Sequence, residues 1–259
     1  MNLLALCLFS YKWLIAVPFL IASTTLIGIP LTFVSLLGMG DWGSKTLAVL
    51  WAKANSRVLG MGVDIEGLEH LQSDRSYVVV ANHWSQLDIL LIYGYLPVEL
   101  KWVMKQELRR VPILGAACAA MGHIIINRSN TAQAIASIER ASKRLVNGMC
   151  VVFFPEGTRA PPGEVRPFKK GAFKLAIDLG LPVLPLTLHG TDQMLPTGTL
   201  NWRPGSTTLE IHPPIDTQGL SEEDVSNLCR QTESLIQRSI SSPIKNDTLG
   251  DPHAEQWRT

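Results

Sequence analysis

Charged side chains are absent from 28 consecutive positions near the N-terminus, from Trp13 to Gly40. The run is too long for a cleaved signal peptide, and it suffices for one membrane-spanning helix, which needs about 20 apolar residues. Pro18, Pro30 and three glycines interrupt it, so it also fits two short helices that enter one leaflet, with a break near residues 28–30. We expect residues 1–40 to bind a membrane, and both arrangements stay open.

Cysteine is scarce as well. The four cysteines are widely spaced and form neither a CxxC motif nor a cluster with histidine; they are Cys7, Cys118, Cys150 and Cys229. This spacing gives no support for a structural zinc site and is typical of reduced thiols in a cytosolic compartment. We therefore expect no metal ion and no bound organic cofactor.

Charge is sparse and unevenly distributed. Only 17% of the residues are charged and 46% are apolar, which excludes a disordered polyelectrolyte. Residues 41–209 contain 18 Lys and Arg against 13 Asp and Glu, whereas residues 210–259 contain 4 against 9. The middle of the chain is therefore the better place for an anionic ligand or surface.

After residue 62, apolar strand-like runs alternate with helical patterns. The runs cover residues 76–81, 100–104, 123–127, 149–154, 181–187 and 206–212, and the helical patterns cover 86–95, 113–121, 131–147, 169–179 and 221–240. Such alternation predicts a single α/β domain with a largely parallel sheet. We assign residues 41–62 to an amphipathic connector, 63–240 to the domain and 241–259 to a flexible polar tail.

Four predicted strands end at residues that can do chemistry. The first is followed by His83, the second by Lys105, the third by Arg128, and the fourth by Glu156 and Arg159. Ligands of an open α/β sheet collect at the carboxyl ends of its strands. The convergence predicts a site at this edge, although Lys105 and Arg128 could each be a solvated strand end.

The stretch NHWSQLD, residues 82–88, has two interpretations. If a helix starts at Ser85, His83 can fold back over its first turn, so that Asp88 accepts a hydrogen bond from the imidazole and leaves the other nitrogen free as a base. Alternatively, Ser85 and Asp88 form a capping box and His83 is a bystander. The stretch alone leaves both open.

The stretch FPEGTR, residues 154–159, places a carboxylate and a guanidinium on a tight turn. Arg159 offers a fork that matches phosphate oxygens, Gly157 allows a ligand to approach the backbone, and Glu156 could bind substrate hydroxyls. The alternative is a Glu156–Arg159 surface ion pair.

Together these residues carry a family resemblance. NHWSQLD, GHIIINR (122–128), FPEGTR and LPVLPL (181–186) are similar, in order and spacing, to the four motifs of the lysophosphatidic acid acyltransferase family, the glycerophospholipid acyltransferases. KQELRRVPILG, residues 105–115, also resembles the approach to the second motif. Trp84 and Asn127 depart from the residues common at their positions.

The resemblance implies acyl transfer from acyl-coenzyme A or acyl-carrier protein to the sn-2 hydroxyl of 1-acyl-sn-glycerol 3-phosphate, giving phosphatidic acid. It implies His83 as base and Asp88 as its orienting residue. Lys105, Arg128 and Arg159 would hold the phosphate, Glu156 the glycerol, and Gly157 and Thr158 would complete the substrate site.

The expected partners are therefore membrane lipids, the acceptor and the donor, with no nucleic acid, and the domain is expected on the cytoplasmic side. We expect backbone N–H groups near Ser85 to stabilise the developing oxyanion. Rival functions are transfer to another lysophospholipid or a lyso-aminolipid, lipid hydrolysis, and lipid binding without catalysis.

Overall fold

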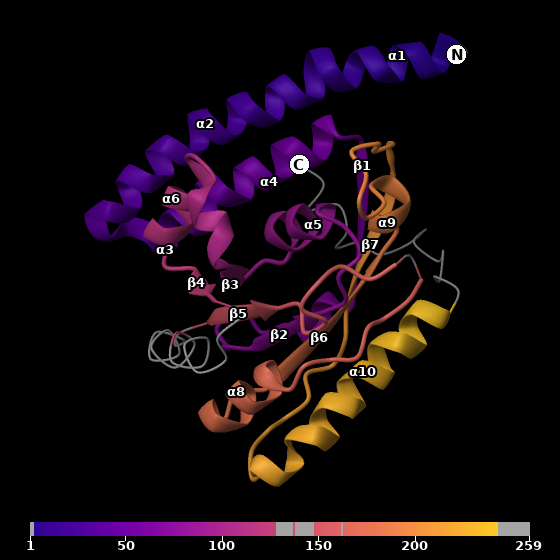
Figure 1. Ribbon diagram of the computed structural model, residues 1–259. Coiled ribbons are helices and arrows are strands. Elements are labelled where there is room, and N and C mark those ends of the chain that lie inside the picture. Colours follow the sequence, from indigo (N-terminus) through magenta and orange to yellow (C-terminus); the bar gives the residue numbers. More distant parts are fainter. Residues whose placement is uncertain (1–2, 128–136, 138–147, 162, 243–259) are drawn as a thin grey trace.

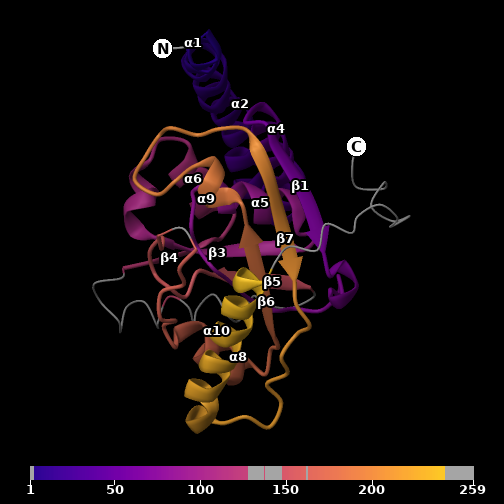
Figure 2. The same ribbon diagram turned by 90° about the vertical axis from the view of Figure 1, so that its right-hand side faces the viewer.

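The computed structural model describes residues 3–127, 137, 148–161 and 163–242. At its centre lies a seven-stranded sheet in the order β1-β7-β6-β2-β5-β3-β4 (Figures 1 and 2). The strands are β1 Met61–Glu66, β2 Val78–Ala81, β3 Glu99–Lys105, β4 Ile124–Ile126, β5 Met149–Phe153, β6 Val183–His189 and β7 Gly205–Ile211. All neighbours pair in parallel except β6 and β7, which are antiparallel. The predicted α/β fold with a largely parallel sheet is confirmed.

Helices cover both faces of the sheet (Figure 1). They are α5 Leu87–Tyr95, α6 Leu114–Ala120, α8 Gly171–Leu179, α9 Thr191–Met194 and α10 Val225–Ser241, with short 3₁₀ turns η4 Leu68–His70, η5 Gln106–Arg110 and η6 Glu222–Asp224. Successive side chains of β2 enter different cores: Val79 and Ala81 join the α5 side, and Val78 and Val80 the α8 and α10 side. This explains why β2 is an unbroken apolar run. Apart from Ser137, the helix predicted over 131–147 lies outside the described residues.

The N-terminal segment is a helical hairpin. Its first arm contains α1 Leu3–Tyr11 and α2 Val17–Val34, and its return arm contains α3 Gly40–Gly43 and α4 Val49–Val58; wider π-helical turns over Lys12–Ala16, Ser35–Met39 and Ser44–Ala48 join them. The chain turns at Gly38, whose φ of 85° lies in the region that glycine tolerates best.

The predicted break near residues 28–30 is wrong, because α2 continues through Gly28 and Pro30. Gly28 serves a packing purpose instead. A Cβ at this position would lie 2.7 Å from Ile113 Cγ2, so the missing side chain makes room for the segment that leads into α6.

The two arms of the hairpin have different surroundings. The return arm packs α4 against α5 and buries Ala52 completely. The outer side of the first arm presents apolar side chains to solvent, with Leu14 75%, Leu26 73% and Leu36 74% exposed. By length and composition, the helical segment Leu6–Val58 is apolar enough to cross a membrane.

Candidate active site

The loop that follows β2 is fixed at its start by Asn82. This side chain is fully buried, and it donates to the Leu188 carbonyl (3.0 Å) and accepts from the Leu188 amide (2.8 Å). The amide group therefore continues the pairing of β2 with β6 by one position. As a result, the next residue, His83, leaves the sheet at a defined place.

His83 and Asp88 are directly hydrogen-bonded. His83 Nδ1 lies 2.8 Å from Asp88 Oδ2, and the Asp88 side chain is fully buried while that of His83 is 17% exposed. The carboxylate requires a proton on Nδ1, so Nε2 carries the lone pair. Within the described chain, Nε2 has no hydrogen-bond partner. The imidazole is therefore oriented as a base.

The capping interpretation also holds, in altered form. The amides of Trp84 (2.8 Å) and Ser85 (2.9 Å) both donate to Asp88 Oδ2. Asp88 thus caps the loop before α5 and orients His83 with the same oxygen. The Ser85 hydroxyl accepts from the Leu87 amide (3.2 Å) and donates to the Leu195 carbonyl (2.8 Å).

These contacts narrow the expected oxyanion donors. The Ser85 amide and the Leu87 amide already have acceptors inside the protein. These two amides are therefore not the predicted donors, and the prediction of donors near Ser85 is left to the other amides of this turn. The sequence could not show this, because it did not reveal that Asp88 gathers the neighbouring amides.

Phe154 and Glu156 of the FPEGTR motif hold the histidine from the loop that follows the neighbouring strand β5. The Phe154 ring stacks on the imidazole, with centroids 3.9 Å apart and planes 11° apart. Glu156 Oε1 accepts from the His83 amide (2.7 Å), and Glu156 Oε2 accepts from the Arg166 amide (2.9 Å). The Ala160 amide also donates to the His83 carbonyl (2.8 Å). The NHWSQLD and FPEGTR motifs are therefore held together by hydrogen bonds and by the stacked rings.

Glu156 differs from the expected glycerol ligand. Its side chain is buried and both its oxygens accept backbone hydrogen bonds, so it positions His83 in this structure. Burial raises the pKa of Glu156 to about 7, against the opposing effect of the two amide donors. The negative charge of Asp88 raises this pKa further. The loop is therefore sensitive to protonation near neutral pH.

Thr158 and Arg159 of the FPEGTR motif are more accessible to solvent than Glu156. Thr158 is exposed and Arg159 is half-buried, and Arg159 forms no ion pair with any described residue. The alternative of a Glu156–Arg159 ion pair is therefore wrong. Gly157 has a φ of 76°, and a Cβ there would lie 2.7 Å from Lys169 Nζ. The φ of the turn favours glycine, whereas the Lys169 side chain is flexible and could move away.

The other two predicted cations belong to the next strands. Lys105 ends β3 and is exposed, without a partner among the described residues, whereas Arg128 lies outside them. Because β2, β5, β3 and β4 are consecutive and parallel, their carboxyl ends lie along one edge. The structure thus places Lys105 on the same edge as His83 and Arg159.

Sequence reasoning gave no role to three residues of this site. Asn82 fixes the exit of β2, Phe154 stacks on the base, and Trp84 donates to the Glu164 carbonyl (2.6 Å) and accepts from the Thr197 hydroxyl (2.6 Å). Asn82 and Phe154 were visible inside the two motifs, whereas the partners of Trp84 lie 80 and 113 positions away. Among the described residues, no cluster of His, Cys, Asp and Glu suits a metal ion.

Comparison with known proteins identifies the class. A family model described as Acyltransferase matches residues 62–189, which span the sheet from β1 to β6. The crystal structure of the 1-acyl-sn-glycerophosphate (LPA) acyltransferase PlsC from Thermotoga maritima is similar, with 29% sequence identity and a TM-score of 0.67. The similarity covers 84% of this chain and 95% of that chain.

Relatives of known name narrow the class to one family. The 1-acyl-sn-glycerol-3-phosphate acyltransferase of Limnanthes douglasii is 31% identical, covering 74% of this chain and 68% of the relative. The alpha enzyme of that name from Mus musculus is 34% identical, covering 74% and 67%. This chain belongs to the acyltransferase family that includes them. It spans about half the length of two chloroplast relatives, BAT2 of Brassica napus at 55% and LPAT1 of Arabidopsis thaliana at 53%.

Proposed function

We propose that this protein transfers an acyl chain from a thioester to the free sn-2 hydroxyl of 1-acyl-sn-glycerol 3-phosphate, forming phosphatidic acid. The main support for this proposal is the His83–Asp88 hydrogen bond, which leaves His83 Nε2 without a partner among the described residues. Arg159, which also has no ion-pair partner among them, lies at the same edge of the sheet. A base and a guanidinium at one edge of the sheet suit an acceptor that has both a hydroxyl and a phosphate. The names of the relatives support the same acceptor.

The proposed reaction is a direct transfer. His83 Nε2 removes the proton of the acceptor hydroxyl while its oxygen attacks the thioester carbonyl. The tetrahedral intermediate collapses with cleavage of the C–S bond, and the thiolate takes the proton back from the imidazolium. Asp88 stabilises that imidazolium through the 2.8 Å contact to Nδ1, and the face of Phe154 restrains the ring. No enzyme-bound acyl intermediate is needed.

Arg159 is proposed as the main phosphate ligand of the acceptor, with Lys105 and Arg128 in support. In this phospholipid a few covalent bonds separate the reacting hydroxyl from the phosphate. Arg159 follows β5, which is the direct neighbour of β2 and of His83. A guanidinium can bind two phosphate oxygens at once, which would fix the hydroxyl near Nε2. Gly157 and Thr158 line the same turn.

The hairpin is proposed to anchor the protein in one leaflet. The return arm is packed on the domain through α4 and α5, so the apolar outer side of the first arm is the surface available to lipid. A segment that turns back at Gly38 and stays beside the domain favours one-leaflet insertion over a single span. Lys45, Lys53 and Arg57 on the return arm favour a cytoplasmic position for the domain.

An acceptor panel tests the proposal. Purified protein would be given one acyl-coenzyme A and a set of lysolipids with phosphate, phosphocholine or amine headgroups, and the products would be identified by mass. We expect phosphatidic acid from 1-acyl-sn-glycerol 3-phosphate and none with His83→Ala. A faster reaction with another lysolipid would replace the acceptor, and release of free fatty acid alone would identify a hydrolase. Repeating the assay with acyl-carrier protein separates the two donors.

A further inference from the structure

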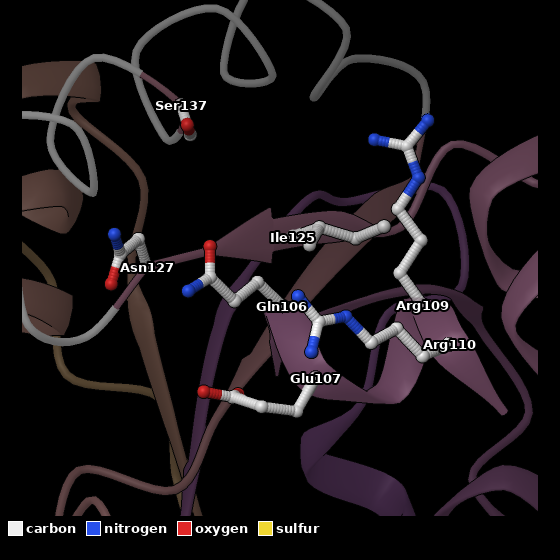
Figure 3. Close-up of a pocket in the computed structure, with 7 residues that line it drawn as sticks. All are labelled: Gln106, Glu107, Arg109, Arg110, Ile125, Asn127 and Ser137. Carbon is white, nitrogen blue, oxygen red and sulfur yellow. The ribbon is translucent and has the colours of Figure 1, made fainter.

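A polar cavity lies at the same edge of the sheet, two to three strands from His83. It has a volume of about 570 Å³ and is bordered by η5, which follows β3, and by the end of β4 (Figure 3). Its lining includes Gln106, Arg109, Arg110, Ile125 and Asn127. Among the described residues, none of those assigned to the base or to the acceptor lines it.

The cavity has an excess of unpaired positive charge. Arg109 and Arg110 are exposed, and neither guanidinium forms a hydrogen bond or an ion pair with a described residue. Figure 3 shows the Arg110 guanidinium turned toward the side chain of Gln106, with the amide of Asn127 on the far side of Gln106. One acid, Glu107, belongs to the lining. The Arg109 guanidinium points away from that of Arg110 (Figure 3), so the two groups border the cavity at different places. Guanidinium groups with amides nearby suit a phosphate group.

The distance from His83 decides which phosphate this is. Neighbouring strands lie about 4.8 Å apart, so β3 is roughly 10 Å and β4 roughly 14 Å from β2 along the order β2-β5-β3-β4. An acceptor phosphate held near Arg159 is only a few bonds from the reacting hydroxyl, and the long side chains proposed as its supporting ligands would extend toward it. A phosphate inside this cavity would lie too far from His83 for that hydroxyl to reach Nε2. The thioester donor differs, because a long pantetheine arm separates its sulfur from its first phosphate.

We infer that the cavity bordered by Arg109 and Arg110 binds the phosphate-bearing end of the acyl donor. The inference rests on the proposed thioester transfer. The chemistry shared by both donors is the phosphate ester at the end of the pantetheine arm, and coenzyme A adds the phosphates of its nucleotide. The thioester would extend along the sheet edge from this cavity toward His83, and the acceptor would approach from the Arg159 side.

The test is the double variant Arg109→Gln/Arg110→Gln. Its matched control is Arg230→Gln, which removes an exposed arginine from α10, on the opposite face of the sheet. KM and kcat would be measured with acyl-coenzyme A, with acyl-carrier protein and with acyl-pantetheine, which has no phosphate. We expect the donor KM of the double variant to rise by about tenfold or more for acyl-coenzyme A. The acceptor KM, kcat and all values for acyl-pantetheine should change by less than about twofold.

Each other outcome has a defined meaning. Equal increases with acyl-coenzyme A and acyl-carrier protein support the shared phosphate ester, and an increase confined to acyl-coenzyme A supports its nucleotide phosphates. An increase confined to acyl-carrier protein would assign the arginines to the surface of that protein and overturn the inference. So would an unchanged donor KM, an increase in the acceptor KM, or an equal loss with acyl-pantetheine.

A binding measurement separates this inference from the proposed function. Calorimetry with coenzyme A alone, on wild type, double variant and control, requires no reaction. If wild type acylates no lysolipid but binds coenzyme A through these arginines, the acceptor assignment fails and the cavity assignment stands. If the wild type transfers acyl chains while the double variant binds coenzyme A as the wild type does, the cavity assignment alone fails.

Discussion

Replacing Asp88 by asparagine probes the centre of the site, because one oxygen of Asp88 performs two tasks. Asp88 Oδ2 accepts from His83 Nδ1 (2.8 Å) and from the amides of Trp84 (2.8 Å) and Ser85 (2.9 Å). Asparagine preserves the shape and one amide oxygen for the two backbone donors. It removes the negative charge that faces the imidazole. The variant therefore separates the electrostatic task from the capping task.

The expected loss can be worked out from the contact. A carboxylate and an imidazolium whose charges lie about 4 Å apart attract each other by about 4 kcal/mol at an effective dielectric constant of about 20. Loss of that attraction where the imidazolium forms lowers kcat by roughly 10³-fold. Asp88 is fully buried and cannot touch a substrate, so both KM values should stay within about threefold. The free energy of unfolding should fall by only about 1–2 kcal/mol.

Single-turnover acyl transfer and urea unfolding measure the two effects. Asp88→Ala is the comparison, because it leaves the Trp84 and Ser85 amides without an acceptor, at a cost of about 1–3 kcal/mol each. The alanine variant should lose stability and activity together, and the asparagine variant mainly activity. A folded Asp88→Asn enzyme with kcat within about tenfold of wild type would refute the role of Asp88 as the residue that orients and stabilises His83.

Three further changes test the other parts of the site. Arg159→Gln should raise the acceptor KM by roughly 10- to 100-fold and leave the donor KM unchanged, since it removes a charge-assisted phosphate contact; equal effects on both would contradict the assignment. The pKa of Glu156 is raised from its ordinary 4.5 to about 7 in the folded protein. The folded state therefore holds this proton more tightly than the unfolded state does, and the resulting stabilisation is complete below pH 4.5 and is lost as the pH rises through 7. Urea unfolding at pH 5 and pH 8 should therefore show a loss of stability at pH 8 in wild type that is smaller in Glu156→Gln, and identical pH slopes would rule out the titration. A variant with Asp in place of Leu14, Leu26 and Leu36 should no longer bind vesicles, while its thermal unfolding should be unchanged. Each of these exposed leucines contributes up to about 1.5–3 kcal/mol when it enters lipid. Retention of the variant on vesicles would show that another surface suffices for binding.

The location of the site was predictable from the sequence because parallel strands share an edge. His83, Lys105, Glu156 and Arg159 each follow an apolar run, and such runs are typical of strands buried on both faces. The spacing of His83 and Asp88 also permitted the contact, once a helix began between them. What the spacing could not decide was whether capping or orientation applied, and the structure shows that one oxygen does both.

Features that depend on distant partners were not predictable. Strand β1, with Gly62, Asp64 and Glu66 among its six residues, has no apolar run, and it exists because β7 pairs with it at the edge of the sheet. The turn of the hairpin lies at Gly38, which adopts a positive φ, whereas Gly28 packs against Ile113 within the continuous helix α2. The position of β6 beside β2, likewise, depends on pairing across about a hundred positions of the chain.

The packing of α4 on α5 has a consequence for how the enzyme would meet its substrate. The return arm of the hairpin packs on α5, whose first turn carries Asp88, so helix packing connects the proposed anchor directly to the His83–Asp88 pair. In the proposed one-leaflet arrangement, this packing would set the height of His83 above the lipid surface, and a flexible tether in place of the hairpin would lose that fixed height. An acceptor that keeps its acyl chain in the leaflet would present its hydroxyl at a constant depth. The packed hairpin would then hold the His83 imidazole at that same depth.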